Sequence, residues 1–284
     1  AAFAQKLGEM GCKLSSANSI NIGRLVPQVA YYVWGYVQLV KRGAIKNGEP
    51  VNICVPTGNF GNILAAYYAG EMGIPVNRFI CASNKNRVLT DFFETGIYNT
   101  KREFYLTNSP SMDILISSNL ERLLYHLAGN DGEEIRRLMD SLEKTQRYEV
   151  SPKIRQGMKK FWGGTATVEE TNATIGAMYR EEEYLMDTHT AVGYKVYRDY
   201  VEATGDETPT LIASTASAYK FAESVAKSIG LGEEENGFRY VEAVAAKTGV
   251  RVPKALKDLD KKEIRHRGVI EIPDMIKVVE ESVK

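Results

Sequence analysis

A short glycine-containing turn has the composition of an anion-binding site. The segment Gly58-Asn59-Phe60-Gly61-Asn62 lies between the apolar run Val51–Val55, expected to be a strand, and the helical stretch Ile63–Met72. Glycine lets the backbone turn sharply near an anion, and the first turn of a helix presents unpaired N–H groups. We predict that this loop binds a phosphate, with the two asparagines as further donors or braces. The alternative is a tight turn capped by an asparagine side chain.

The elements around this loop predict an α/β fold with a mostly parallel sheet and covering helices. A second strand is expected at Arg78–Ala82, so that strand, helix and strand follow one another. A similar unit, with a strand over Pro209–Ala213 and a helix over Ala218–Ile229, is expected at the other end of the sheet. Further helices are predicted at Ala1–Met10, Arg24–Arg42, Ile114–Ile116, Leu120–Leu127, Ile135–Leu142 and Met275–Val283.

Composition excludes several classes of protein. The chain has 284 residues, of which 44% are apolar and 25% charged, as in ordinary globular proteins. Its 36 basic residues balance 36 acidic ones, so we expect no nucleic acid and no membrane surface as partner. Three widely spaced cysteines and three scattered histidines indicate reduced thiols in a cytoplasmic protein and no metal site.

Several segments together make the sequence resemble threonine synthase, a pyridoxal-phosphate enzyme with the tryptophan-synthase-β type of fold. They are Ser15–Asn21, Gly58–Asn62, Cys81–Phe93, Ser111–Leu123, Asp187–Gly193 and Ser214–Ser217, in family order. The resemblance covers the whole chain but only the carboxyl-terminal part of the family's sequence. It implies a fold-type II enzyme that is incomplete at the amino terminus. Residues 1–14 would end the smaller domain, and residues 15–284 would form the large cofactor-binding domain with a carboxyl-terminal helical covering.

The resemblance also implies the roles of individual residues toward pyridoxal 5'-phosphate. The loop from Gly58 to Asn62 would wrap the cofactor phosphate, and the Thr215 hydroxyl would face the pyridine nitrogen. A neutral hydroxyl does not force a proton onto that nitrogen as a carboxylate would, so the protein tunes the cofactor in this way. For Thr215 the alternative is a helix N-cap at the end of a strand.

The substrate implied by the resemblance, O-phospho-L-homoserine, carries a phosphate of its own. We predict that it is contacted by Asn18, Asn21, Arg24, Ser83, Asn84 and Lys85. The first three lie in a polar loop leading into a helix, where a guanidinium could clamp a phosphate. The last three follow the second strand, at the sheet edge where α/β proteins bind ligands. The alternatives are helix caps, turns and a solvated arginine.

The lysine that binds the cofactor covalently in the family is absent from these residues. In the family it stands in a Phe-Lys-Asp context, upstream of the matched region, and no such motif occurs here. Lys220 is the nearest imitation, but it falls within a predicted helix and at the wrong place in family order. His189 is interpreted as a capping or structural residue. No catalytic residue is therefore assigned.

These residues predict part of an enzyme. Charge-assisted hydrogen bonds contribute about 1.5–3 kcal/mol each, whereas association costs about 4–15 kcal/mol, so the phosphate loop alone should bind weakly. We expect part of a threonine synthase, a lyase that converts O-phospho-L-homoserine and water to L-threonine and phosphate, and expect this chain alone to be inactive. The alternatives are a natural noncatalytic phosphate-ligand-binding module or partner subunit, or a related pyridoxal-phosphate lyase or dehydratase. The oligomeric state stays open.

Overall fold

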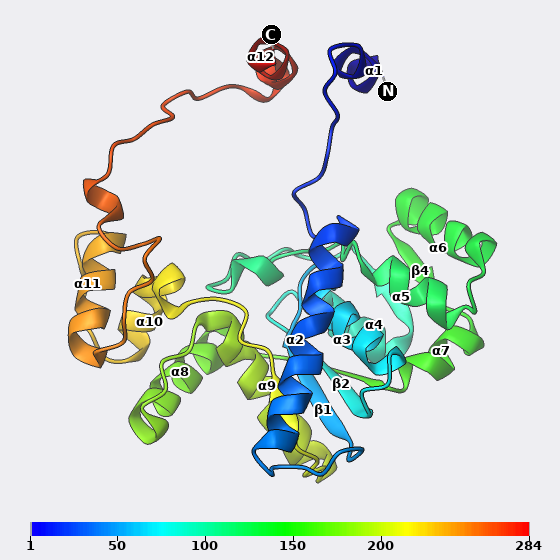
Figure 1. Cartoon of the computed structure of the whole chain (residues 1–284). Helices are drawn as coiled ribbons and strands as arrows, with labels where there is room; N and C mark the ends of the chain where they lie inside the picture. Colours follow the sequence, from blue (N-terminus) through cyan, green and yellow to red (C-terminus); the bar gives the residue numbers. More distant parts are fainter. Residues whose placement is uncertain (1, 284) are drawn as a thin grey trace.

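A four-stranded parallel sheet organises the molecule (Figure 1). The computed structural model describes residues 2–283, so Ala1 and Lys284, the outer limits of the predicted first helix and last domain, lie outside it. The strands lie in the order β5-β2-β1-β6, with bounds Phe161–Thr165, Val76–Ser83, Val51–Pro56 and Thr210–Ile212. All pairs in this sheet are parallel, so the loops after β1, β2 and β6 meet at one edge. The predicted α/β class is confirmed.

Strand β1 is an inner strand of the sheet, paired with β2 and β6, and both of its faces are covered. All six of its residues are buried, as expected for a parallel strand between two helical layers. Ile53 and Val55 pack in the cluster that contains α2 (Ile22–Lys41) and α3 (Gly61–Glu71). Cys54, on the other face, packs in the cluster that contains α9 (Thr188–Thr204). The alternation of side chains along the strand therefore builds two cores.

The middle section departs from the helical prediction in two ways. Residues 114–116 are irregular and follow a short 3-10 helix, η1 (Pro110–Met112). Strand β5 was missed because its two glycines hide a strand pattern; a Cβ on Gly163 would lie 2.8 Å from the Cα of Thr90. The remaining elements here are α4 (Val88–Thr95), α5 (Leu120–Leu127), α6 (Gly132–Thr145), α7 (Pro152–Met158) and the antiparallel pair β3 (Ile97–Asn99) and β4 (Arg147–Glu149).

The carboxyl-terminal part forms a separate apolar cluster. It joins α8 (Val168–Glu182), α10 (Ala222–Ser228) and α11 (Gly237–Thr248). The helix predicted at 218–229 is divided, because a 3-10 helix, η2 (Ala218–Phe221), precedes α10. Two further 3-10 helices, η3 (Leu259–Lys261) and η4 (Ile272–Asp274), lie in the tail.

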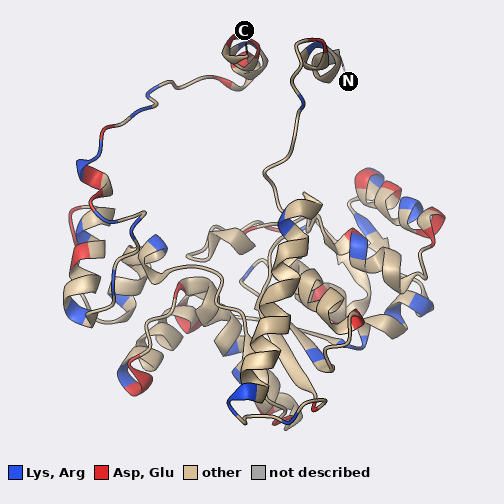
Figure 2. Ribbon diagram, in the orientation of Figure 1, with Lys and Arg blue, Asp and Glu red and all other residues tan. Residues whose placement is uncertain are grey.

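Both end helices lie away from the body and next to each other (Figure 1). These are α1 (Ala2–Glu9) and α12 (Met275–Ser282), joined by an ion pair of 2.6 Å between Lys6 Nζ and Glu280 Oε2. Elsewhere, charges of both signs are interspersed over the outer helices (Figure 2). Within residues 2–283, no helix has the length and apolar composition needed to cross a bilayer.

Candidate functional site

The loop between β1 and α3 is fixed by hydrogen bonds that other segments donate to its carbonyl groups. Ser117 Oγ donates to the Gly58 carbonyl at 2.7 Å. The backbone N and side-chain Nδ2 of Asn119 donate to the Asn59 carbonyl at 3.0 and 2.9 Å. These bonds satisfy the acceptors of the loop from one side and fix its backbone. Neither partner was predicted, because both lie about 60 residues away in the chain, although the polar run before α5 was a signal.

The start of α3 remains without a side-chain cap. Phe60 is its N-cap residue and makes no capping hydrogen bond, so the predicted alternative of an asparagine cap is wrong. Phe60 is in the left-handed region, with φ of 64°, and its side chain is 1% exposed. Burial of this ring among Phe93 and Phe161 holds a backbone conformation that side chains rarely adopt. The N–H groups of the first turn are therefore presented in a fixed arrangement suited to an anion.

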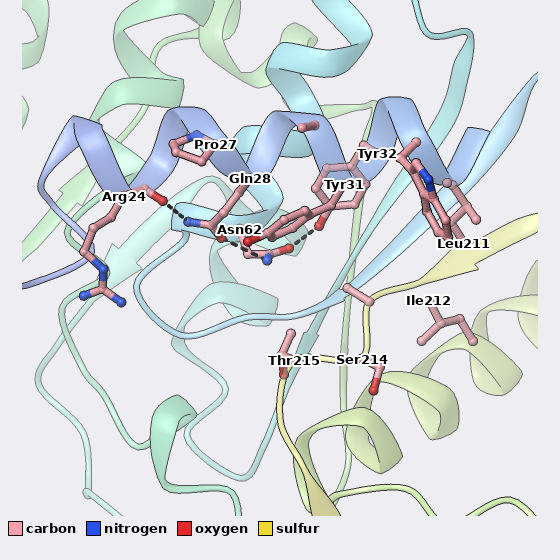
Figure 3. Close-up of a pocket in the computed structure, with 14 residues that line it drawn as sticks. Arg24, Pro27, Gln28, Tyr31, Tyr32, Asn62, Leu211, Ile212, Ser214 and Thr215 are labelled. Carbon is pink, nitrogen blue, oxygen red and sulfur yellow. Dashed lines mark hydrogen bonds between the residues drawn. The ribbon is translucent and has the colours of Figure 1, made fainter. Parts of the chain in front are cut away.

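Asn62 braces the loop against α2. Its Nδ2 donates to Gln28 Oε1 at 3.0 Å, and the Tyr32 hydroxyl donates to its Oδ1. Figure 3 shows that this series of hydrogen bonds continues, because Gln28 Nε2 donates to the Arg24 carbonyl at 2.6 Å. Burial, and to a lesser degree the neighbouring Cys54, raises the pKa of Tyr32, so it remains a neutral donor. Of the two predicted roles for Asn62, the geometry provides the brace.

The two glycines of the loop differ in the space that a side chain would have. A Cβ on Gly58 would lie 2.1 Å from the Ser111 carbonyl oxygen in η1, so any side chain there would force the backbone to shift. A Cβ on Gly61 would meet Asn119 Nδ2 at 3.4 Å and Ser19 at 3.7 Å, which are ordinary contacts. Close packing of η1 on the loop thus depends on Gly58.

A cavity of about 280 Å³ lies over the loop. The whole predicted loop lines it, together with Ser19, Arg24, Gln28, Pro56, Thr57, Ser111, Met112, His189, Thr215, Ala216 and Lys220. A larger cavity of about 1090 Å³ adjoins it between α2 and the segment after β6 (Figure 3). Arg24, Gln28, Asn62 and Thr215 line both cavities. A ligand larger than a phosphate could therefore extend from the loop into the second cavity.

Thr215 is exposed and stands at the boundary between the two cavities. The cap of η2 is Ser217, whose Oγ accepts from the Tyr219 N–H at 3.3 Å, so the alternative of a capping role for Thr215 is wrong. Within residues 2–283, the Thr215 hydroxyl makes no hydrogen bond. It is therefore available to a ligand.

The predicted substrate residues upstream of α2 divide into two groups. Arg24 lines both cavities, and its guanidinium donates to the Ala17 carbonyl. Asn21 caps α2 by accepting from the Gly23 N–H at 2.9 Å, and Asn18 Oδ1 accepts from Ser19 Oγ at 3.1 Å. Neither asparagine lines these cavities, so both match the predicted alternative of caps and turns.

The predicted substrate residues at the end of β2 and just after it lie outside these two cavities. Asn84 is buried, and its Nδ2 lies 2.7 Å from Asp113 Oδ1 and 2.8 Å from Thr107 Oγ1. Lys85 Nζ lies 3.8 Å from the centre of the Tyr105 ring. Ser83 is buried, and its Oγ finds no partner within residues 2–283. Asn84 and Lys85 thus hold the segment that carries η1, and a contact of these three residues with substrate stays a prediction.

His189 and Lys220 bring further ionisable groups to the smaller cavity. His189 is 3% exposed at the start of α9, and Asp187, the N-cap of that helix, accepts from its N–H at 2.8 Å. Lys220 is exposed, in η2. Residues 2–283 contain no cluster of His, Cys, Asp or Glu side chains that could hold a metal ion.

Comparisons with known proteins agree on one family. The family described as "Threonine synthase, C-terminal" matches residues 190–283. Threonine synthase-like 1 of Macaca fascicularis is 46% identical over 228 residues, which are 79% of this chain and 30% of that protein. Threonine synthase of Saccharomyces cerevisiae is 35% identical over 240 residues, covering 79% and 46% of the two chains. The chain therefore spans less than half the length of these relatives.

A solved structure extends this similarity to the fold. The structure of PLP-bound threonine synthase from Brucella melitensis superposes with a TM-score of 0.81 at 34% identity. The superposition covers 99% of this chain and 54% of that one. The parallel sheet and the helices that cover it are thus common to both proteins.

Proposed function

We propose, from the premise that this chain belongs to the threonine synthase family, that it supplies the phosphate-binding part of a pyridoxal-phosphate lyase. The reaction converts O-phospho-L-homoserine and water to L-threonine and phosphate. One observation carries the proposal: the loop after β1 ties its carbonyls to Ser117 and Asn119 and leaves the start of α3 without a cap. Backbone N–H groups fixed in this way suit the phosphate of the cofactor.

The residues of the cavity fit pyridoxal phosphate on two counts. The uncapped start of α3 offers donors to the phosphate, and the Thr215 hydroxyl, at the boundary to the larger cavity, is available to the pyridine nitrogen. When bound, the cofactor supplies an electron sink for carbanions at the substrate. The part of this chain is to hold the phosphate, orient the ring and bind the substrate.

Arg24 is the best candidate for the phosphate of O-phospho-L-homoserine. It lines both cavities, and its guanidinium offers donors in the planar arrangement that phosphate oxygens accept. Asn18 and Asn21 support this residue by shaping the loop before α2. Lys220, which also lines the smaller cavity, adds a second positive charge.

An assay of the native polypeptide, purified from its source with pyridoxal phosphate, tests the proposal. We expect L-threonine and inorganic phosphate to form in equal amounts from O-phospho-L-homoserine. We expect the 284-residue chain alone to give no turnover. Binding of phosphate ligands without turnover by the native polypeptide would favour the noncatalytic alternative, and a keto acid product would favour a dehydratase.

A further inference from the structure

The histidine at the start of α9 occupies a position between two walls of the smaller cavity. Ser111 in η1 donates its backbone N–H to His189 Nε2 at 3.1 Å. The centre of the Phe221 ring, which ends η2, lies 4.8 Å from the centre of the imidazole. One buried side chain therefore contacts both the segment that packs on the phosphate loop and the segment that follows Thr215.

The contacts of the imidazole define which nitrogen carries the proton. Because Nε2 accepts from the Ser111 N–H, the proton of the neutral ring is on Nδ1. Nδ1 lies 3.3 Å from Asp187 Oδ1 and 3.4 Å from Thr188 Oγ1. Burial disfavours the Asp187 carboxylate, but hydrogen bonds from His189 and Thr190 outweigh it and lower its pKa. An ionised Asp187 thus holds the ring in the orientation that Ser111 requires.

A capping role does not explain the imidazole. The cap of α9 is the Asp187 carboxylate, which accepts from the N–H groups of His189 and Thr190 at 2.8 and 3.3 Å. Those bonds use the backbone N–H groups of residues 189 and 190 and would persist with another side chain at position 189. The ring itself accepts a hydrogen bond from η1 and packs against Phe221.

The 3-10 helix η1 packs directly on the phosphate loop. The Ser111 carbonyl packs so closely on Gly58 that a Cβ there would lie 2.1 Å from it. Ser111 therefore contacts His189 through its N–H and the loop through its carbonyl. Asn84 Nδ2 also holds this segment, by donating to Oδ1 of Asp113 at the end of η1.

We propose that His189 is a positioning residue that holds η1 against the phosphate loop and so sets the width of the cavity. The link from this width to activity rests on the function proposed above. We assign the imidazole no acid or base role, because its Nε2 accepts from the Ser111 N–H and its Nδ1 faces Asp187.

Two substitutions separate the hydrogen bond from the volume of the ring. His189→Leu fills similar space without an acceptor, whereas the Oε1 of a glutamine in His189→Gln can still accept from the Ser111 N–H. His126→Gln is the matched control, because His126 Nε2 pairs with the Tyr68 hydroxyl at 3.1 Å and lies outside this cavity. Each protein is measured for amide exchange in residues 109–113 and for its Kd for inorganic phosphate.

We expect exchange of the Ser111 amide to be roughly tenfold faster in His189→Leu, with His189→Gln and His126→Gln near the unsubstituted protein. Phosphate affinity should fall by a similar factor in His189→Leu only. Equal exchange in His189→Leu and the unsubstituted protein, or equal losses in the leucine and glutamine variants, would overturn the proposal. If the unsubstituted protein binds no phosphate, the proposed function fails, and the amide exchange still decides the role of His189.

Discussion

The two strand–loop–helix units of the sheet share one plan and differ in rigidity. In the first unit, β1 pairs on both sides and its loop is tied by Ser117, Asn119 and Asn62. In the second, β6 is a three-residue edge strand with one neighbour, and Thr215 after it is exposed. One unit therefore offers a fixed set of backbone donors, while the other offers a single side chain on a less restrained segment.

The largest effect is expected from a substitution that disrupts the loop of the first unit. Gly58→Ala places a Cβ 2.1 Å from the Ser111 carbonyl, so η1 must move, and we expect a loss of about 3 kcal/mol in the free energy of unfolding. Gly61→Ala is the matched control: its Cβ makes ordinary contacts, and we expect a change within about 0.5 kcal/mol. Chemical denaturation measures both. Equal losses would mean that the close packing on Gly58 is not what stabilises the loop.

A smaller effect tests the charge preference of the rigid unit. Asn59→Asp puts a carboxylate beside the proposed site of the cofactor phosphate, so we expect cofactor affinity of the native polypeptide to fall roughly tenfold, or about 1.4 kcal/mol. Asn236→Asp, at the cap of α11, is a suitable control because either residue caps a helix well. Titration with pyridoxal phosphate reports the difference. An unchanged affinity would remove the loop from the site.

Low pH should weaken the contact of Asp187 with His189, the residue that contacts both η1 and Phe221. The pKa of Asp187 is below its ordinary value of 3.8, because hydrogen bonds from His189 and Thr190 outweigh the burial that opposes its charge. This carboxylate therefore adds stability above pH 3.8, which is lost as the pH falls through its lower folded-state pKa. Free energies of unfolding between about pH 5 and pH 2 should fall less steeply for Asp187→Asn than for the unsubstituted protein. Parallel curves would contradict this.

The smallest effect on stability is expected in the second unit. Thr215→Val removes an exposed hydroxyl with no protein partner within residues 2–283, so the free energy of unfolding should change by less than about 0.5 kcal/mol. The absorbance or affinity of bound pyridoxal phosphate should nevertheless change. Thr167→Val is the opposite control, because loss of the capping box of α8 costs about 1 kcal/mol and leaves the cofactor unaffected. A cofactor signal identical in Thr215→Val would exclude the hydroxyl from the site.

Local sequence predicted the central strands and the loop, but not the residues that hold them. Val51–Val55 is recognisable because a strand buried on both faces is an unbroken apolar run. Gly163 and Gly164 conceal β5, since their small size serves contacts with α4 and α9. Residues 114–116 were wrongly predicted as helical because the segment before them is held by Asp113, which bonds to Asn84, far away in sequence.

The candidate site shows the same difference between local sequence and distant contacts. The 58–62 loop was predicted from its own composition, and Thr215 was predicted only through the family resemblance. Ser117, Asn119 and the contact between Ser111 and His189 depend on chain segments that meet only in the fold. A sequence pattern indicates where an anion can bind, whereas the partners that give the site its shape are set by tertiary packing.

The buried ring of Phe60 couples the proposed anion site to the folded core. Because its backbone belongs to the loop and its side chain packs against Phe93 and Phe161, the loop cannot rearrange while the core stays intact. The population able to bind an anion is then the same as the native population. Under rising denaturant, apparent phosphate affinity should stay constant up to the global transition and disappear with it, and added phosphate should shift that transition upward.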